Sequence, residues 1–248
     1  MKVKTILVSQ PEPASDKSPY SRLKEKHKLK IDFRPFIHVE GLTAKEVRLQ
    51  KINFSDYNNI ILTSRNAVDH FFRITEEMRY KVPDATKYFC QSEVVALYLQ
   101  NHVVYRKRKI YVGGRTFNDL TEQISKYNEE SFLIPCANVL SPAIPKKLDE
   151  LGVKWTQGTF YKTEISDLSH LKDVYYDILV FFSPSGIESL MHNFPDFKQN
   201  NTRIAVFGKT TVNAAEKAGL RIDISAPSPK VPSMSKALDL YIEKVNKK

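Results

Sequence analysis

Hydroxyl side chains recur where short apolar runs end and amphipathic stretches begin. Helix N-termini at the carboxyl ends of parallel strands bind carboxylates and phosphates, so these positions could hold an anionic ligand. Ser and Thr are also favoured N-caps, which leaves a structural role open for each one. Because the pattern occurs in both halves of the chain, it predicts a site for a polyanionic small molecule. The residues are Ser9, Thr63, Ser64, Ser183, Ser185, Thr210 and Thr211.

Familiar catalytic and cofactor motifs are absent. The chain has no GxGxxG, GxxxxGK[ST], HExxH or GxSxG, and none of its 6 histidines has a partner at i,i+4 spacing. Two cysteines, Cys90 and Cys136, are too few for a disulfide framework or a Cys-based zinc site. We therefore predict no metal and no cofactor, free thiols and a reducing compartment.

The charge balance narrows the class of partner. The 248 residues include 38 Lys and Arg against 28 Asp and Glu, a net charge of +10, with 42% hydrophobic residues. Such a composition is typical of a globular protein with one large or two small domains. Nucleic acid, an anionic membrane surface or an acidic small molecule could explain the charge. The densest basic runs, Tyr105 to Lys109 and Lys244 to Lys248, are typical of solvated loops and tails.

The N-terminal segment gives no targeting signal. Its apolar run, Thr5 to Ser9, stops at Gln10 and Pro11 and is too short for a signal peptide. No stretch approaches the roughly 20 apolar residues of a membrane span. We therefore expect a cytoplasmic protein with no membrane contact.

Short apolar runs alternate with amphipathic stretches, which predicts parallel sheets covered on both faces. Lys30 to Glu40 and Lys154 to Glu164 break this rhythm and are expected to form a two-stranded linker between two lobes. The predicted strands are 4–9, 59–63, 87–90, 131–135, 178–182 and 203–207. The predicted helices are 19–28, 66–79, 93–101, 117–127, 142–151, 187–192, 211–218 and 233–245.

A weak internal repeat supports two lobes. When the chain is shifted so that Ser64 coincides with Ser183, Val68 coincides with Ile187, and a similar shift aligns Cys90 with Gly208. Each half thus holds a strand-Ser-helix junction followed by a second strand-turn-helix junction. We predict an α/β fold with two lobes, each built on a parallel sheet.

Four segments resemble the uroporphyrinogen-III synthase family. They are ILTSRNAV from Ile61, GTFYKT from Gly158, FFSPSGIESL from Phe181 and FGKTTVNAAEKAGLRIDISAPSP from Phe207. The resemblance implies two flavodoxin-like lobes joined by a two-stranded linker. One lobe would comprise residues 1–35 and 166–248, the other 41–155, and the linker 30–40 and 154–165.

The resemblance also implies an activity. Members of the family cyclise hydroxymethylbilane to uroporphyrinogen III, with inversion of ring D and loss of water, in tetrapyrrole biosynthesis. No cofactor or metal takes part, and a monomer is expected. The substrate bears eight carboxylates, which would account for the excess of Lys and Arg.

Particular residues match the family's motifs. Tyr161 matches a linker tyrosine that hydrogen-bonds the leaving hydroxyl, and a phenol is protonated at neutral pH, as an acid must be. Thr211 matches the second threonine of a GxTT turn that binds substrate carboxylates. The implied substrate-binding residues are Ser64, Ser183, Ser185, Gly208, Lys209, Thr210 and Thr211.

Three positions depart from the family pattern. Lys209 stands where proline is common, Gln10 where arginine is common, and Glu93 at a threonine position, where it would repel a carboxylate. An alternative hypothesis is therefore a catalytically diverged two-lobed protein that binds a polyanionic small molecule. A third, nucleic-acid binding through Arg106 to Lys109, lacks the interleaved aromatic platform that such binding uses, and we expect no nucleic-acid partner.

Overall fold

The chain forms two compact units in the computed structural model, which describes residues 2–15, 17–114 and 116–247. The terminal unit comprises Met1–His38 and Glu164–Lys248, and the middle unit comprises Val39–Thr163. The backbone therefore passes between the units twice, after His38 and after Thr163.

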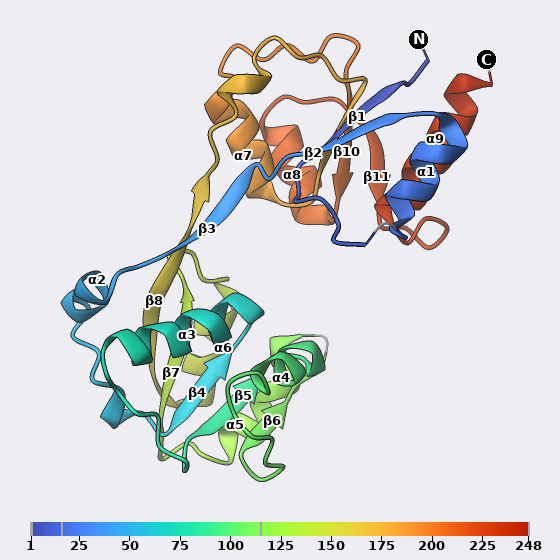
Figure 1. Cartoon of the computed structure of the whole chain (residues 1–248). Coiled ribbons are helices and arrows are strands. Elements are labelled where there is room, and N and C mark those ends of the chain that lie inside the picture. The colour runs from blue at the N-terminus through green and yellow to red at the C-terminus, as the bar shows by residue number, and fades with distance from the viewer. Residues whose placement is uncertain (1, 16, 115, 248) are drawn as a thin grey trace. The chain divides into compact units, whose positions relative to one another are not determined.

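The terminal unit is a sheet with helices on both faces (Figure 1). Its strands are β1 (Thr5–Val8), β2 (Lys30–Phe33), β9 (Ile178–Phe181), β10 (Arg203–Phe207) and β11 (Ile222–Ala226). Its helices are α1 (Pro19–His27), η3 (Ser169–Leu171), α7 (Pro184–Asn193), α8 (Lys209–Lys217) and α9 (Met234–Asn246). The strand order is β11-β10-β9-β1-β2, and the registered pairings are parallel. This is the flavodoxin-like order, in which the order of the strands reverses between β1 and β9.

Alternation along the strands divides the apolar residues of the terminal unit between two core layers. Ile6 and Val180 pack with α1 and α9, whereas Leu7 and Leu179 pack with α7 and α8. Successive side chains of a strand point to opposite faces, so a strand covered on both faces must be apolar throughout. The continuous run of β9, buried along its whole length, has this character.

The middle unit has a six-stranded sheet in the order β3-β8-β7-β4-β5-β6. The strands are β3 (Ile37–Gly41), β4 (Asn59–Leu62), β5 (Lys87–Cys90), β6 (Ile110–Val112), β7 (Ser131–Ala137) and β8 (Lys154–Ile165). The helices are α2 (Ala44–Leu49), η1 (Phe54–Asp56), α3 (Arg65–Glu77), α4 (Glu93–Leu99), η2 (Phe117–Leu120), α5 (Thr121–Ser125) and α6 (Ala143–Leu151). Ile60 and Leu62 pack with α3 and α4, and Ile61 packs with α5 and α6.

The predicted fold class, α/β with parallel sheets, is confirmed, because each sheet contains four parallel strand pairs. Five elements were not predicted, namely α2, η1, β6, η3 and β11. The segment 30–40 also differs from the single connector that was expected, because Lys30–Phe33 pairs with β1 along its full length as β2. Its weak apolar signal has a physical cause: β2 lies at the sheet edge and buries only Ile31.

Within the described ranges, none of the helices combines the length and the apolar character that a membrane crossing needs.

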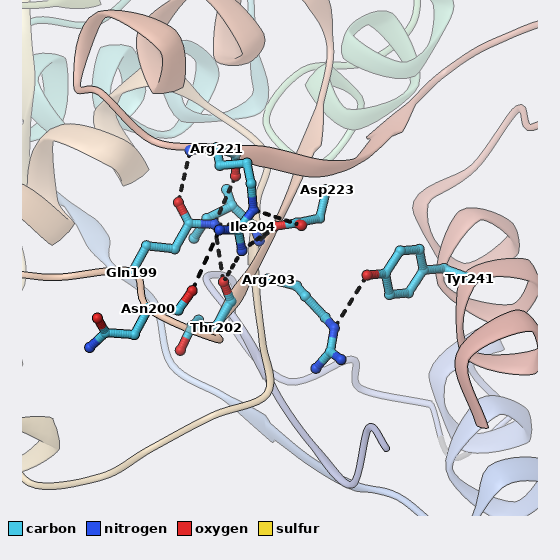
Figure 2. Close-up of polar contacts among 8 residues, drawn as sticks. All are labelled: Gln199, Asn200, Thr202, Arg203, Ile204, Arg221, Asp223 and Tyr241. Carbon is cyan, nitrogen blue, oxygen red and sulfur yellow. Dashed lines mark hydrogen bonds and ion pairs between the residues drawn. The ribbon is translucent and has the colours of Figure 1, made fainter. Parts of the chain in front are cut away.

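Side-chain hydrogen bonds fix the amino edge of each sheet, where its parallel strands begin. In the terminal unit, Asp223 Oδ2 accepts the backbone N–H of Ile204 at 3.0 Å and joins β11 to β10 (Figure 2). Arg221 Nε donates to Asp223 Oδ1 at 3.0 Å, and Gln199 Nε2 donates to the Arg221 carbonyl at 2.8 Å. Arg221 is the last residue of the GLR sequence at 219–221, part of the segment from Phe207 that resembles the family. This sequence therefore has a structural role at the amino edge of the sheet.

The middle unit is fixed at its amino edge by Glu130, which precedes β7. Lys87 Nζ, at the start of β5, donates to Glu130 Oε1 at 2.9 Å and to Oε2 at 2.8 Å. Asn59 Nδ2, at the start of β4, donates to Oε2 at 3.0 Å. Burial acts to raise the pKa of Glu130, but the hydrogen bonds from Lys87 and Asn59 outweigh it and lower the pKa.

We predict that Glu130 makes the middle unit sensitive to acid. Because its folded pKa lies below its unfolded pKa, its contribution is present above the unfolded value and is lost as the pH falls through the folded value. Glu130→Gln should lower the free energy of unfolding by about 1 kcal/mol at pH 7 and weaken its pH dependence in acid. The exposed neighbour Glu129 supplies the control, Glu129→Gln. Equal urea midpoints for the two variants would contradict this role.

Candidate functional site

Ser64 stands at the carboxyl edge of the middle unit, where β4 ends and α3 begins. Its backbone is extended, with φ −157° and ψ 168°, and its Oγ accepts the N–H of Ala67 at 3.1 Å. The serine is therefore a helix N-cap, as its residue type allows. The same Oγ lies 3.3 Å from the hydroxyl of Tyr161, so the cap also contacts the predicted catalytic side chain.

A β-bulge in β8 places Tyr161 beside Ser64. Cys136 of β7 pairs with Thr159 and Ala137 pairs with Tyr161, which leaves Phe160 as an extra residue in β8. A bulge interrupts the alternation of side chains and redirects those that follow. Phe160 and Tyr161, although adjacent, are both buried in the core layer that packs against α3, with 0% and 6% of their surface exposed.

The phenol of Tyr161 is held in its protonated form. Burial raises the pKa of Tyr161, and the hydrogen bond with Ser64 opposes this only in part. The ordinary phenol pKa is near 10. Tyr161 is therefore a proton donor at neutral pH and is suited to general-acid chemistry.

His70 and Arg73, which the sequence analysis did not identify, pack around Tyr161. The His70 ring stacks on the Tyr161 ring with centroids 4.8 Å apart and an angle of 19°. Arg73 Nε donates to His70 Nδ1 at 3.2 Å, and Arg73 Nη2 donates to the carbonyl of Phe160 at 3.2 Å. Burial and then the charge of Arg73 lower the pKa of His70. A neutral ring that accepts at Nδ1 carries its proton on Nε2.

Gly41, the last residue of β3, makes room for this arrangement. A Cβ atom there would lie 2.8 Å from Arg73 Nη2 and 2.9 Å from His70 Cε1. The sequence held a signal for the pair, because His70 and Arg73 are three residues apart and so share one face of a helix. Nothing in the sequence connected that face with Tyr161.

The carboxyl edge of the terminal unit presents the hydroxyls predicted at β1 and β9. Ser183 caps α7, with its Oγ accepting the N–H of Gly186 at 3.2 Å, and lies 3.1 Å from the Ser185 Oγ. A Cβ atom on Gly186 would lie 3.6 Å from Ser183 Oγ and 3.7 Å from Ser9 Oγ. Both serines therefore flank the point between β1 and β9 where ligands bind in open α/β sheets.

Helix α8 begins without a side-chain cap. Its N-cap is Gly208, whose φ of +88° and ψ of 147° form a conformation that is essentially restricted to glycine. Lys209 and Thr210, the first helical residues, are exposed. The leading N–H groups of a helix have no intrahelical acceptor, so this N-terminus can receive an anion.

Thr211 differs from the other predicted binding residues because its side chain is buried. Only 1% of its surface is exposed, and its Oγ1 makes no hydrogen bond within the described residues. Buried hydroxyls are nearly always paired, so an unpaired one is either a cost to stability or a group kept for a ligand.

The other candidate residues lie in different places: Gln10 and Glu93 follow β1 and β5 at the carboxyl edges, whereas the basic run lies elsewhere. Arg106 to Lys109 lie in the loop before β6, at the opposite, amino edge of the middle unit. Cys90 and Cys136 are free and buried, and burial raises their pKa values to about 12 and about 11, so neither provides a thiolate. Glu93 is exposed in the first turn of α4, and Gln10 is exposed after β1. The part of the chain that the structure describes holds no group of three His, Cys, Asp or Glu suited to a metal ion.

These features define an α/β protein of two units, with hydroxyls and helix N-termini gathered at the carboxyl edges of parallel sheets. A family model described as uroporphyrinogen-III synthase HemD matches residues 18–236. The chain belongs to the uroporphyrinogen-III synthase family, which consists of cyclising lyases.

One curated relative and two solved structures are similar to this chain. A uroporphyrinogen-III synthase of Chlorobaculum parvum is 25% identical over 252 aligned positions, covering 95% of this chain and 98% of that protein. The uroporphyrinogen-III synthetase structure of Helicobacter pylori is similar in fold, with a TM-score of 0.64 and 19% identity over 98% of this chain and all of that one. A mutant uroporphyrinogen III synthase of Thermus thermophilus gives a TM-score of 0.58 at 13% identity, over 99% of this chain and 100% of that chain.

We predict that Thr211→Val does not destabilise the protein. Valine removes an unpaired buried hydroxyl, so the free energy of unfolding should stay the same or rise by about 1 kcal/mol. Thr75 supplies a matched control, because it is equally buried but its Oγ1 donates to the Phe72 carbonyl at 2.9 Å. Thr75→Val should therefore lower the free energy of unfolding. Equal losses for both variants in urea titrations would refute the distinction.

Proposed function

We propose that this chain is an active uroporphyrinogen-III synthase that converts hydroxymethylbilane to uroporphyrinogen III and water. One observation carries the proposal: Tyr161, a buried and protonated phenol 3.3 Å from Ser64 Oγ, belongs to a chain whose family match spans residues 18–236. The enzyme would need no cofactor, work as a monomer in the cytoplasm and serve tetrapyrrole biosynthesis.

Binding of the substrate would use the carboxyl edges. Hydroxymethylbilane carries eight carboxylates, and the net charge of +10 favours their approach. The exposed Lys209 and Thr210 would meet one carboxylate at the uncapped start of α8, with Gly208 keeping the backbone accessible. Ser183 and Ser185 would meet a second at α7, and Ser64 a third at α3.

The chemistry would begin with proton transfer. Tyr161 would donate its phenolic proton to the hydroxyl of ring A, which leaves as water and produces an azafulvenium cation. Ring D then attacks through its substituted carbon and forms a spirocycle, which opens and recloses to give the type III isomer. The ring carbon that forms the final bond loses its proton, and the phenolate of Tyr161 recovers one.

Positioning of the substrate would matter as much as proton transfer. Hydroxymethylbilane that closes in solution does so without inversion, so the enzyme must keep the disfavoured carbon of ring D close to the azafulvenium cation. We propose that lobes 1–35 with 166–248 and 41–155 close on the substrate about the linker, 30–40 and 154–165. The two chain crossings between the units, after His38 and after Thr163, support a hinge there.

A coupled assay tests the activity. Hydroxymethylbilane is generated in place, the product is oxidised to uroporphyrin, and types I and III are separated by chromatography. Mainly type III supports the proposal. Only type I, from protein shown to be folded, would favour the alternative of a diverged polyanion-binding protein, for which the exposed Glu93 at the start of α4 provides a reason.

We predict that Tyr161→Phe separates turnover from binding. Loss of the phenolic proton should lower kcat for type III formation by about 100-fold or more, with KM little changed. Tyr57→Phe is the control, because it removes a hydroxyl that donates to Thr156 Oγ1 at 2.9 Å elsewhere in the middle unit. An unchanged kcat in Tyr161→Phe, or equal losses in both variants, would remove Tyr161 from the mechanism.

A further inference from the structure

A cavity of about 590 Å³ opens at the amino edge of the middle unit. It lies between the C-terminal half of α3, the loop before β5 and the loop before β6, and Phe72, Thr86 and Lys109 are among its lining residues. The carboxyl edge with Ser64 is at the other end of the same parallel strands. The cavity is therefore separate from the candidate functional site of this unit, and its size is typical of small-molecule pockets.

Aromatic rings form much of its wall. Phe72 stacks on His102 with centroids 4.6 Å apart and an angle of 6°, and the Tyr88 centroid lies 6.2 Å from that of Phe72. Tyr80 and Val103 also line the cavity. Flat apolar walls of this kind suit a planar aromatic ligand, because aromatic rings prefer offset-stacked or edge-to-face contacts with one another.

Two wall residues carry hydroxyl groups that are free to bond a ligand. Thr86 and Tyr88 are 3% and 5% exposed, and neither side chain makes a hydrogen bond with a described residue. Burial raises the pKa of Tyr88, so its phenol is a donor at neutral pH. Because both residues line the cavity, their hydroxyls can hydrogen-bond a polar group of a ligand bound there.

The two loops that frame the cavity are strongly basic. They carry Arg79, Lys81 and the run Arg106 to Lys109, against Asp84 as their acidic residue. Arg106 and Lys109 line the cavity, and Arg106 lies 3.7 Å from Asp84 in an exposed ion pair. Such an exposed pair contributes little and leaves the guanidinium able to bind another anion.

We propose that this cavity binds a planar aromatic anion, with its ring against Phe72 and Tyr88 and its acidic group at Arg106 and Lys109. The ring would gain the apolar contacts of the wall. A polar substituent of the ring would accept the hydrogen bond that the Tyr88 hydroxyl now lacks. The site is independent of the proposed synthase activity and gives the basic run a ligand of its own.

The test compares two probes of the same shape on the full chain, 6-hydroxy-2-naphthoate (naphthoate) and the neutral 6-hydroxy-2-naphthamide (naphthamide), whose ring hydroxyl supplies the acceptor for Tyr88. Titrations followed by NMR should place the shifts of both probes in residues 72–88 and 102–110, with naphthoate bound about tenfold more tightly. The double variant Arg106→Gln with Lys109→Gln should abolish that difference. Lys107→Gln with Arg108→Gln removes the same charge from residues that do not line the cavity, and should preserve it.

A second variant distinguishes the loss of a binding group from the loss of the fold. Tyr88→Phe keeps the ring, and it should weaken binding of naphthamide and naphthoate alike while the unfolding midpoint is retained. Shifts outside this region, or equal losses of naphthoate affinity in both double variants, would overturn the proposal. Tighter binding of a single-stranded oligonucleotide than of naphthoate, reduced equally by both double variants, would also overturn it and indicate a nucleic-acid surface.

Discussion

The candidate site depends on the extra residue in β8. With Thr159 opposite Cys136 and Tyr161 opposite Ala137, Phe160 is the additional residue, and it fills the core beside α3. If β8 were regular, Phe160 would pair with Ala137 and Tyr161, the next residue, would face the opposite side of the sheet. The Arg73 contact with the Phe160 carbonyl fixes the bulge to the helix that also provides His70. The burial of Tyr161, its raised pKa and its contact with Ser64 therefore all depend on this one β-bulge.

The two units share one arrangement of parallel strands but connect the strands in a different chain order. The sheet of the terminal unit, β2-β1-β9-β10-β11, and the row β8-β7-β4-β5-β6 of the middle unit share one pattern, and the serines follow the third strand of each. In both units the carboxyl edge presents caps and helix N-termini, whereas the amino edge is fixed by carboxylates such as Asp223 and Glu130. This division separates the groups that can bind a ligand from those that hold the strands in register.

Much of the fold could be predicted, because strands buried on both faces leave continuous apolar runs, as in Ile178–Phe181. The edge strand β2 was not predicted as a strand of the terminal sheet, because it buries only Ile31. Hydroxyl positions at strand ends were also accessible to sequence reasoning, because capping has local chemical rules. The bulge at Phe160 and the stacking of His70 could not be predicted from the sequence. Both depend on which residues of β7 and α3 lie opposite β8. The burial of Thr211 likewise follows from packing in the terminal unit rather than from its motif.

The central claim is that a buried phenol, Tyr161, donates the proton that releases water. An acid acts only while it is protonated, so its contribution is lost as the pH rises through its pKa, which burial places above the ordinary value near 10. The most direct measurement is the pH dependence of kcat for type III formation, with folding checked at each pH. The account predicts a constant kcat from neutral pH to about pH 10 and a decline only above it. A decline with its midpoint below about pH 9 would contradict it and assign the proton to another group.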